Sequence, residues 1–394
     1  EISDYLYKKN PEGANEIINK LEAKYKQHID ELFATQEYKQ KGLEVVKSHF
    51  DYIRSYTKDL FTLFEEKVVL AQGELISTAM VNFYLQECGV KSVLLPALEF
   101  MRTDKNAEPD PVYIKDKLRA QLDLYPDTEI YITQGFICRN AYGEIDNLQR
   151  GGSDYTASLI GAAVNASEIQ IWTDIDGMHN NDPRIVDKTA PVRQLHFEEA
   201  AKLAYFGAKI LHPTCIQPAK YANIPVRLLN TMDPEAPGTL ISNDTEKGKI
   251  KAVAAKDNIT AIKIKSSRML LAHGFLRKVF EIFESYQTSI DMICTSEVGV
   301  SVTIDNTKHL NEILDDLKKY GTVTVDKEMC IICVVGDLEW ENVGFEAKAL
   351  DAMRDIPVRM ISFGGSNYNI SFLIRECDKK VALQSLSDML FNGK

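Results

Sequence analysis

QRGGSDYTASLIGAAVNASEIQIWTDID, residues 149–176, contains the alternation that decides the fold. Apolar residues recur at helical spacing from Ser153 to Asn165, and Glu168 to Trp172 has the composition of a short buried strand. Strands and helices alternate in the same way on both sides, from Val90 to Leu229. This pattern predicts an open, mostly parallel sheet with helices on both faces, a three-layer α/β architecture.

The residues before this region predict helices, with apolar positions three and four residues apart in Pro11 to Ala34, Glu37 to Phe64 and Glu65 to Cys88. After the α/β region, Asp233 to Gly238 contains two prolines and a glycine, and Ser242 to Lys249 is polar and charged. We interpret these two segments as a domain boundary.

Beyond the boundary the chain repeats a β-α-β-β-α-β unit. The first unit comprises Ile259–Ile264, Gly274–Tyr286, Ser289–Ile293, Val298–Ile304, Lys308–Tyr320 and Thr322–Val325. The second comprises Met329–Val335, Val343–Met353, Val358–Phe363, Asn369–Ile374 and Lys379–Phe391, and has no sixth strand. Ile250–Ala255 is a strand without a partner, so we infer that it completes the second unit and that the first unit is nested inside the second.

Composition excludes several classes of function. The chain has 394 residues, with 46 Lys and Arg against 57 Asp and Glu, a net charge of −11. Such a chain has no overall field to attract nucleic acid or an anionic membrane. The N-terminal residues show no apolar signal core, and we find no apolar run long enough to span a membrane. Seven scattered cysteines predict reduced thiols in the cytoplasm.

Gln149 to Ala157 is the first candidate site. Gly151 and Gly152 permit close approach of the backbone to a ligand, and Ser153 or Asp154 can cap the helix that begins there. The free amides of that helix attract an anion, and the guanidinium of Arg150 suits a carboxylate or phosphate. The alternative is an ordinary capped turn.

The second candidate site follows the predicted strand that ends at Trp172. Thr173 and Asp174 lie where ligands bind in open α/β sheets, and a long loop with Asp182 and Arg184 follows. The alternative is a solvated loop with Asx turns. In the third segment, AYFGAKILHP, Lys209 is either exposed or directed into a site.

Seven segments occur together in an order that resembles the aspartate kinases of the amino acid kinase superfamily: GELIST, MRTD, ITQGFI, RGGSDYTA, WTDIDG…DPR, FGAKILHP and NTMDPEAPGTLI. The tandem unit resembles paired ACT domains, which are amino-acid-sensing modules, through HGFLRKVFEIF, SIDMICTSE and FGGSNYNISFLI. The helical start resembles the lysine-sensitive, single-function branch.

The resemblance implies an amino acid kinase fold at 1–245, followed by two ferredoxin-like α+β ACT domains. The first is nested at 259–327, and the second is formed by 250–257 plus 328–394. It also implies transfer of a phosphoryl group from MgATP to the side chain of L-aspartate, giving 4-phospho-L-aspartate and ADP at the start of lysine, threonine and methionine biosynthesis. ATP and Mg would be required, with no metal held by protein side chains alone. Free L-lysine is the expected inhibitor, and a cytoplasmic homodimer joined through the ACT domains is expected.

The resemblance also assigns roles to single residues. The expected substrate-binding residues are Glu74 for the ammonium group, and Arg150, Gly151, Gly152 and Ser153 for the carboxylates. Asp154 would orient the catalytic lysines, among them Lys209 near the transferring phosphoryl group. The expected nucleotide-binding residues are Thr173, Asp174, His179, Arg184, Lys209 and Ile210. The expected lysine-binding residues are Met269, Gly274, Phe275, Ile290, Asp291, Ser296 and Glu297.

The sequence departs from the family pattern in several places. The KFGGTS motif, with its first strand and a catalytic lysine, is not in the printed chain, so we expect the chain as printed to be impaired. His179 replaces a frequent Tyr, Lys202 a frequent Glu, and Ala272 a usual Ser in the effector site.

Two other functions stay open at this point. A kinase of another amino acid such as glutamate would be expected to lack both Glu74 and the paired ACT units. A non-catalytic amino-acid sensor with a degenerate kinase domain is favoured only by the missing motif. Threonine is the rival effector, but it has no second ammonium group and would leave one carboxylate unpaired.

Overall fold

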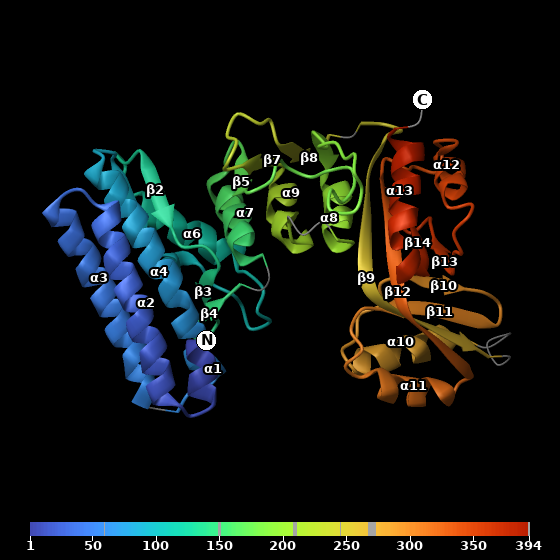
Figure 1. The fold of residues 1–394 in the computed structure, drawn as a ribbon, viewed down its shortest axis with the longest axis horizontal. Helices are drawn as coiled ribbons and strands as arrows, with labels where there is room; N and C mark the ends of the chain where they lie inside the picture. Colours follow the sequence, from blue (N-terminus) through green and yellow to red (C-terminus); the bar gives the residue numbers. More distant parts are fainter. Residues whose placement is uncertain (59, 149–150, 208–210, 245, 267–272, 393–394) are drawn as a thin grey trace. The chain divides into compact units, whose positions relative to one another are not determined.

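The computed structural model describes residues 1–394 except 59, 149–150, 208–210, 245, 267–272 and 393–394 (Figure 1). The chain divides into two compact units. The first comprises Glu1–Ile169 with Thr214–Ile224, and the second comprises Gln170–Pro213 with Pro225–Lys394. Each unit is described by itself.

The first unit begins with helices whose apolar faces pack together. They are α1 (Ile2–Tyr7), α2 (Pro11–Leu32), α3 (Gln36–Ser55), the short 3-10 helix η1 (Tyr56–Lys58) and α4 (Leu63–Glu87). Figure 1 shows α2, α3 and α4 lying side by side, and α3 contacts both of the others. Their shared core consists of Ile18, Ile29, Phe33, Val46, Phe50, Ile53, Ile76 and Met80.

The boundary between α3 and α4 differs from the prediction. We expected one helix to run to Phe64 and the next to begin at Glu65, but α3 ends at Ser55 and α4 begins at Leu63. A capping box sets the start of α4, because Thr62 accepts from a backbone amide of the first turn and Glu65 accepts from the backbone amide of Thr62. The pattern of apolar residues continues across this break, so it did not reveal the break.

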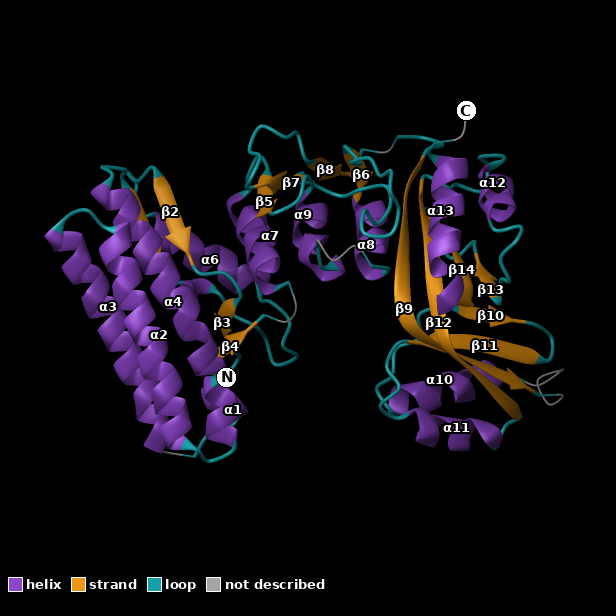
Figure 2. Cartoon of the chain, viewed as in Figure 1, coloured by secondary structure: helices purple, strands orange, loops and turns teal. Residues whose placement is uncertain are grey.

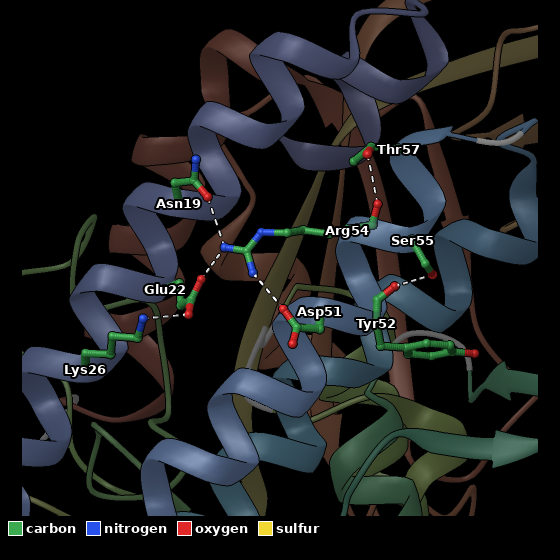
Figure 3. Close-up of polar contacts among 8 residues, drawn as sticks. All are labelled: Asn19, Glu22, Lys26, Asp51, Tyr52, Arg54, Ser55 and Thr57. Atoms are coloured by element: carbon green, nitrogen blue, oxygen red, sulfur yellow. Dashed lines mark hydrogen bonds and ion pairs between the residues drawn. The ribbon is translucent and has the colours of Figure 1, made fainter.

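Polar contacts join α2 to α3 on the side shown in Figure 3. Glu22 accepts from Arg54 and pairs with Lys26 at 2.8 Å, and Arg54 also donates to Asn19 at 2.9 Å. Burial alone raises the pKa of Glu22, but the hydrogen bonds from Lys26 and Arg54 lower it below its ordinary value. The charged Glu22 therefore fastens the two helices to each other.

Helix α4 is long and apolar enough, by length and composition, to cross a membrane, although we predicted no such segment. The core helix of a globular protein meets the same criterion. Ile76 and Met80 of α4 belong to the core shared with α2 and α3, and Ala71 packs beside β1 (Ser92–Leu95). These contacts explain its hydropathy as that of a packed helix.

The rest of the first unit carries the candidate substrate site. β1 pairs in parallel with β2 (Ile130–Thr133), and β3 (Ile137–Arg139) forms an antiparallel hairpin with β4 (Ile145–Asn147). The helices are α5 (Ala97–Phe100), α6 (Pro111–Leu122), α7 (Gly152–Val164), α9 (Gln217–Ala222) and the 3-10 helix η2 (Pro213–Ile216). α7 packs against α6 and α9.

The second unit contains a four-stranded sheet in the order β5-β7-β8-β6. Its strands are β5 (Ile169–Thr173), β6 (Gln194–His196), β7 (Val226–Asn230) and β8 (Thr239–Ser242), and α8 (Phe197–Tyr205) follows β6. β6 and β8 are parallel, whereas β7 and β8 are antiparallel. β8 lies between the two segments that we interpreted as a boundary, so the chain returns to this sheet after Gly238.

A six-stranded sheet in the order β10-β11-β9-β12-β14-β13 follows (Figure 2). Its elements are β9 (Ile250–Lys265), α10 (Phe275–Ser285), β10 (Ile293–Thr295), β11 (Gly299–Ile304), α11 (Leu310–Lys318), β12 (Thr322–Gly336), α12 (Phe345–Ala352), β13 (Met360–Ser362), β14 (Asn369–Arg375), η4 (Glu376–Asp378) and α13 (Lys379–Leu390). Separate cores lie under α10 with α11 and under α12 with α13.

The two repeats share their central strands. The strands expected at Ile250–Ala255 and Ile259–Ile264 form the continuous β9, which is antiparallel to the equally continuous β12. The first half of β9 pairs with the second half of β12, from Ile250 opposite Gly336. This is the pairing that a nested arrangement requires, and the domain limits themselves stay predictions.

Candidate active site

The first unit contains a cleft of about 650 Å³ at the start of α7. It is lined by Leu70, Phe136, Asn147, Leu148, Gly151, Gly152, Ser153 and Asp154. The structure thus brings four of the predicted site residues together with a turn of α4 and the β3–β4 hairpin. Arg150 lies outside the described residues.

The start of α7 is suited to an anion. Gly151 is the N-cap, with φ 73°, and none of the described side chains caps the helix, so the expectation that Ser153 or Asp154 does so is wrong. Both side chains lie inside the first turn instead. The amides at this end are therefore left for a ligand, and the positive end of the helix dipole points at the same place.

The glycines at this helix start are required by packing. A Cβ on Gly152 would lie 3.0 Å from the Cβ of Phe136, and Gly151 adopts the left-handed conformation that glycine takes without strain. The buried thiol of Cys215 donates to the Gly151 carbonyl oxygen at 3.1 Å. The side chains of Phe136 and Cys215 thus fix the backbone of Gly151 and Gly152 at the cleft.

Phe136 is a cleft residue that sequence reasoning missed. It has φ 64°, an outlier for a bulky side chain, and such strain persists only where neighbours impose it. Its amide donates to Thr156 Oγ1 at 3.0 Å, and the same hydroxyl donates to the Gly152 carbonyl oxygen at 2.9 Å. Thr156 therefore fastens Phe136 to the helix start. The ITQGFI motif pointed to this position only through the family resemblance.

Two carboxylates stand close to the cleft. Asp154 lines it, and Glu74 lies one turn along α4 from the lining residue Leu70, on the same face. Burial raises the pKa of both carboxyls, and neither forms an ion pair with another described residue. An incoming ammonium group would hold each of them in the charged form.

In the second unit, the predicted nucleotide-binding residues lie at the end of β5 and on the loop that leads to β6. Thr173 Oγ1 accepts from the amide of Ile175 at 3.2 Å, an ST turn, and Asp174 is exposed. The ring of His179 is 3.0 Å from Thr189 Oγ1. Thr173 and Asp174 thus lie at the carboxyl end of a strand, the usual place for a ligand in an α/β sheet.

Arg184 is presented to solvent by a neighbouring carboxylate. Its guanidinium donates twice to Asp182, at 2.9 and 2.7 Å, and its side chain is 73% exposed. The arginine lowers the pKa of Asp182 below its usual range. Lys209 and Ile210 lie outside the described residues.

The predicted effector residues lie in the first repeat. Gly274 is the N-cap of α10, with φ 81° and no side-chain cap from the part of the chain that the structure describes, and Phe275 begins the helix. Glu297 is exposed, whereas the side chain of Asp291 is fully buried. Met269 lies outside the described residues.

Comparison with known proteins places the chain in a family. The model of the amino acid kinase family matches residues 13–230, more than half of the chain, and an ACT domain model matches residues 332–390. The lysine-sensitive aspartokinase 3 of Escherichia coli K12 is 34% identical over 335 residues, covering 82% of this chain and 75% of the relative. The chain belongs to the aspartokinase family.

Other aspartokinases are similar to the chain in sequence or in structure. Chloroplastic aspartokinase 1 of Arabidopsis thaliana is 37% identical over 351 residues, and the match spans 62% of that relative's length. The crystal structure of E. coli aspartokinase III with aspartate and ADP, in its R state, matches with a TM-score of 0.81 and 29% identity, covering 99% of this chain and 91% of that one. The T-state structure with lysine and aspartate matches with a TM-score of 0.78 and 30% identity. The expected fold class, an amino acid kinase domain followed by ACT units, is confirmed.

Proposed function

We propose that this aspartokinase transfers the γ-phosphoryl group of MgATP to the side-chain carboxylate of L-aspartate, giving 4-phospho-L-aspartate and ADP. The cleft at the uncapped start of α7, with Asp154 beside it, is the observation that carries the proposal. A carboxylate oxygen attacks the γ-phosphorus while the bond to the leaving ADP oxygen breaks, so the protein contributes mainly position and charge.

Different residues of the cleft would bind the carboxylates of aspartate and its ammonium group. The amides after Gly151, together with the guanidinium of Arg150, would hold the carboxylates. Glu74 would take the ammonium group, which relieves the cost of its burial. Asp154 would aim the ammonium group of Lys209 at the transferring phosphoryl group.

The nucleotide would be held at the carboxyl end of β5. Thr173 and Asp174 end this strand, and the exposed guanidinium of Arg184 suits a phosphate. The other proposed nucleotide-binding residues are His179, whose ring is hydrogen-bonded to Thr189, and Ile210. The metal enters as MgATP, and among the described residues no group of three or more His, Cys, Asp or Glu forms a metal site.

Regulation by free L-lysine is proposed for the first ACT unit, as the lysine complex of the E. coli relative suggests. The amides at the start of α10 suit the α-carboxylate of lysine, and Asp291 and Glu297 suit its two ammonium groups. Met269, Ile290 and Ser296 would line the rest of the lysine-binding site. Pairing of two chains through these units is also proposed. None of the seven cysteines forms a disulfide bond, which supports a reducing compartment such as the cytoplasm.

The test is formation of 4-phospho-L-aspartate, trapped as the hydroxamate, by the full-length protein. We expect Asp154→Asn to lower kcat by roughly 10²–10³, the range for a lost group that stabilises a transition state. Asp127→Asn, at an exposed position, is the matched control and is expected to leave kcat unchanged. Wild-type turnover by Asp154→Asn would contradict the proposed role, and wild-type protein without turnover would contradict the proposed reaction.

A further inference from the structure

The end of helix α8 is joined to the first ACT unit by a hydrogen bond. Tyr205, the last residue of α8, donates from its hydroxyl to Asp291 Oδ1 at 2.5 Å. The side chain of Asp291 is 0% exposed. Tyr205 is itself 41% exposed, so the buried partner that holds the end of this helix is the carboxylate of Asp291.

The carboxylate of Asp291 also forms an ion pair with a lysine of the same chain. Lys256 Nζ, from β9, lies 2.7 Å from Asp291 Oδ1, 2.9 Å from Asp305 Oδ2 and 4.2 Å from the centre of the Tyr205 ring. Asp291, Asp305 and Tyr205 thus surround one ammonium group with two carboxylates and an aromatic face. Asp291 Oδ2 is buried and has no hydrogen-bond partner among the described residues.

The chain after α8 touches β9 a second time. A Cβ on Gly207 would lie 2.2 Å from the Ala255 carbonyl oxygen, and Gly207 has φ 134°, which other residues rarely adopt. Tyr205 therefore lies against Lys256 itself, and Gly207 lies against the adjacent Ala255. Lys209, the proposed catalytic lysine, follows Gly207 by two residues in the sequence.

We propose that Tyr205 is a positioning residue for the segment that carries Lys209, and that its anchor, Asp291, is the carboxylate that an amino-acid effector competes for. This inference rests on the proposed function, with free L-lysine as the effector. Lys256 serves as an internal ammonium group that fills the site while the effector is absent, and Asp305 keeps it paired once Asp291 is released.

Competition follows from the burial of Asp291. Because its side chain is fully covered, an effector ammonium group can reach it only after Tyr205 or Lys256 has moved away. The Tyr205 hydrogen bond then belongs to the state without effector, and effector binding breaks it. Since coupling between two equilibria is reciprocal, weakening the hydrogen bond strengthens effector binding.

Tyr205→Phe in the full-length protein tests this inference, because it removes one hydroxyl and retains the ring. We expect the Kd for L-lysine, measured by calorimetry, to fall about tenfold, the effect of a hydrogen bond to a charged group. We expect kcat without lysine to fall by a smaller factor, with the Kd for ATP less affected. A damaged fold would not bind lysine more tightly, so the affinity separates positioning from structural harm.

Tyr221→Phe is the matched control, because Tyr221 is 82% exposed, and wild-type values are expected for it. A Tyr205→Phe variant whose lysine affinity and turnover equal those of the wild type overturns this inference. The calorimetric measurement needs no turnover. Wild-type protein that binds lysine but forms no phosphoaspartate would therefore count against the proposed reaction and not against the role of Tyr205.

Discussion

The two ACT repeats place opposite charges at corresponding positions. Asp291 precedes the buried Met292 in the first repeat, and Arg359 precedes the buried Met360 in the second. The amide of each residue donates to a carbonyl of its repeat's next strand, Asp291 to Thr303 at 2.9 Å and Arg359 to Leu373 at 2.7 Å. The backbone positions correspond, and the side chains do not.

The partners of these residues differ as well. Asp291 is fully buried against Lys256, whereas Arg359 meets Asp326 at 2.8 Å with side chains that are 31% and 45% exposed. A buried carboxylate can exchange one ammonium group for another, while a half-exposed arginine repels an ammonium group. The repeated fold therefore provides equivalent backbone positions in both repeats. The charge and burial of the side chain at each position decide whether an amino-acid ammonium group can bind there.

The largest expected effect is on stability. Lys256→Met leaves Asp291 as a buried charge without its counter-ion, and we expect a loss of about 3–5 kcal/mol in the free energy of unfolding. Denaturant unfolding measures it. Lys263→Met, at an exposed position of the same strand, is the control and is expected to stay within about 0.5 kcal/mol of wild type. A loss below 1 kcal/mol for Lys256→Met would remove the distinction between the repeats.

Substitution of Glu297, the second proposed effector carboxylate of the first repeat, tests whether the two repeats differ in lysine binding. Glu297→Gln removes a charge from an exposed side chain, and we expect the Kd for lysine to rise about tenfold, with little change in stability. Calorimetric titration measures this. Glu346→Gln, in the first turn of α12 in the second repeat, is expected to leave the Kd unchanged. An equal effect of both substitutions would show that the repeats bind alike.

The dependence of stability on pH gives a smaller effect. Burial, followed by the hydrogen bond to Asp291, raises the pKa of Tyr205 to about 12. Burial alone lowers the pKa of Lys256, but its hydrogen bonds to Asp291 and Asp305 raise it overall. For both groups the folded pKa exceeds the unfolded value of about 10, so their stabilisation is complete below that pH and is lost as the pH rises towards 12.

We therefore expect the free energy of unfolding to fall between pH 9 and pH 11.5, more steeply for the wild type than for Tyr205→Phe. Thermal or denaturant unfolding across this range measures the slope. Arg359→Met, in the second repeat, should retain the wild-type slope. A wild-type slope in Tyr205→Phe would mean that this hydroxyl does not titrate as proposed.

The smallest expected effect is that of Arg359→Met itself. Its partner Asp326 is half-exposed, and an exposed ion pair contributes about 0–1 kcal/mol. Denaturant unfolding in low and high salt is expected to show a difference within that range, smaller in high salt. A loss as large as that of Lys256→Met would contradict the contrast in burial.

Much of this architecture could be predicted because it is written in local patterns. The alternation around Ser153–Asn165 and the two β-α-β-β-α-β series each repeat over enough residues to be recognised. Gly151 and Gly152 marked the cleft because the absence of a side chain is a property of the residue itself, and it permits the left-handed φ of Gly151 and the close packing of Gly152 on Phe136.

Other features depend on contacts that no local pattern contains. The left-handed conformation of Phe136 is imposed by its packing at Gly152 and its bond to Thr156. Asp291 was expected to bind the effector, but its side chain is buried and contacts Tyr205 and Lys256, which are distant in sequence. Such contacts join residues of different elements that only the folded chain brings together, so no local pattern reveals them.

The pairing of β9 with β12 also sets an order of folding. Lys265 opposite Thr322 encloses only the first repeat, whereas Ile250 opposite Gly336 encloses that repeat and both of its flanking strand halves. Closing the shorter loop costs less chain entropy, and contacts distant in sequence form slowly. The inner repeat, with Asp291, can therefore assemble first and act as the template on which the outer repeat closes. A chain emerging during synthesis would acquire its proposed sensor of amino acid supply before the outer repeat is complete.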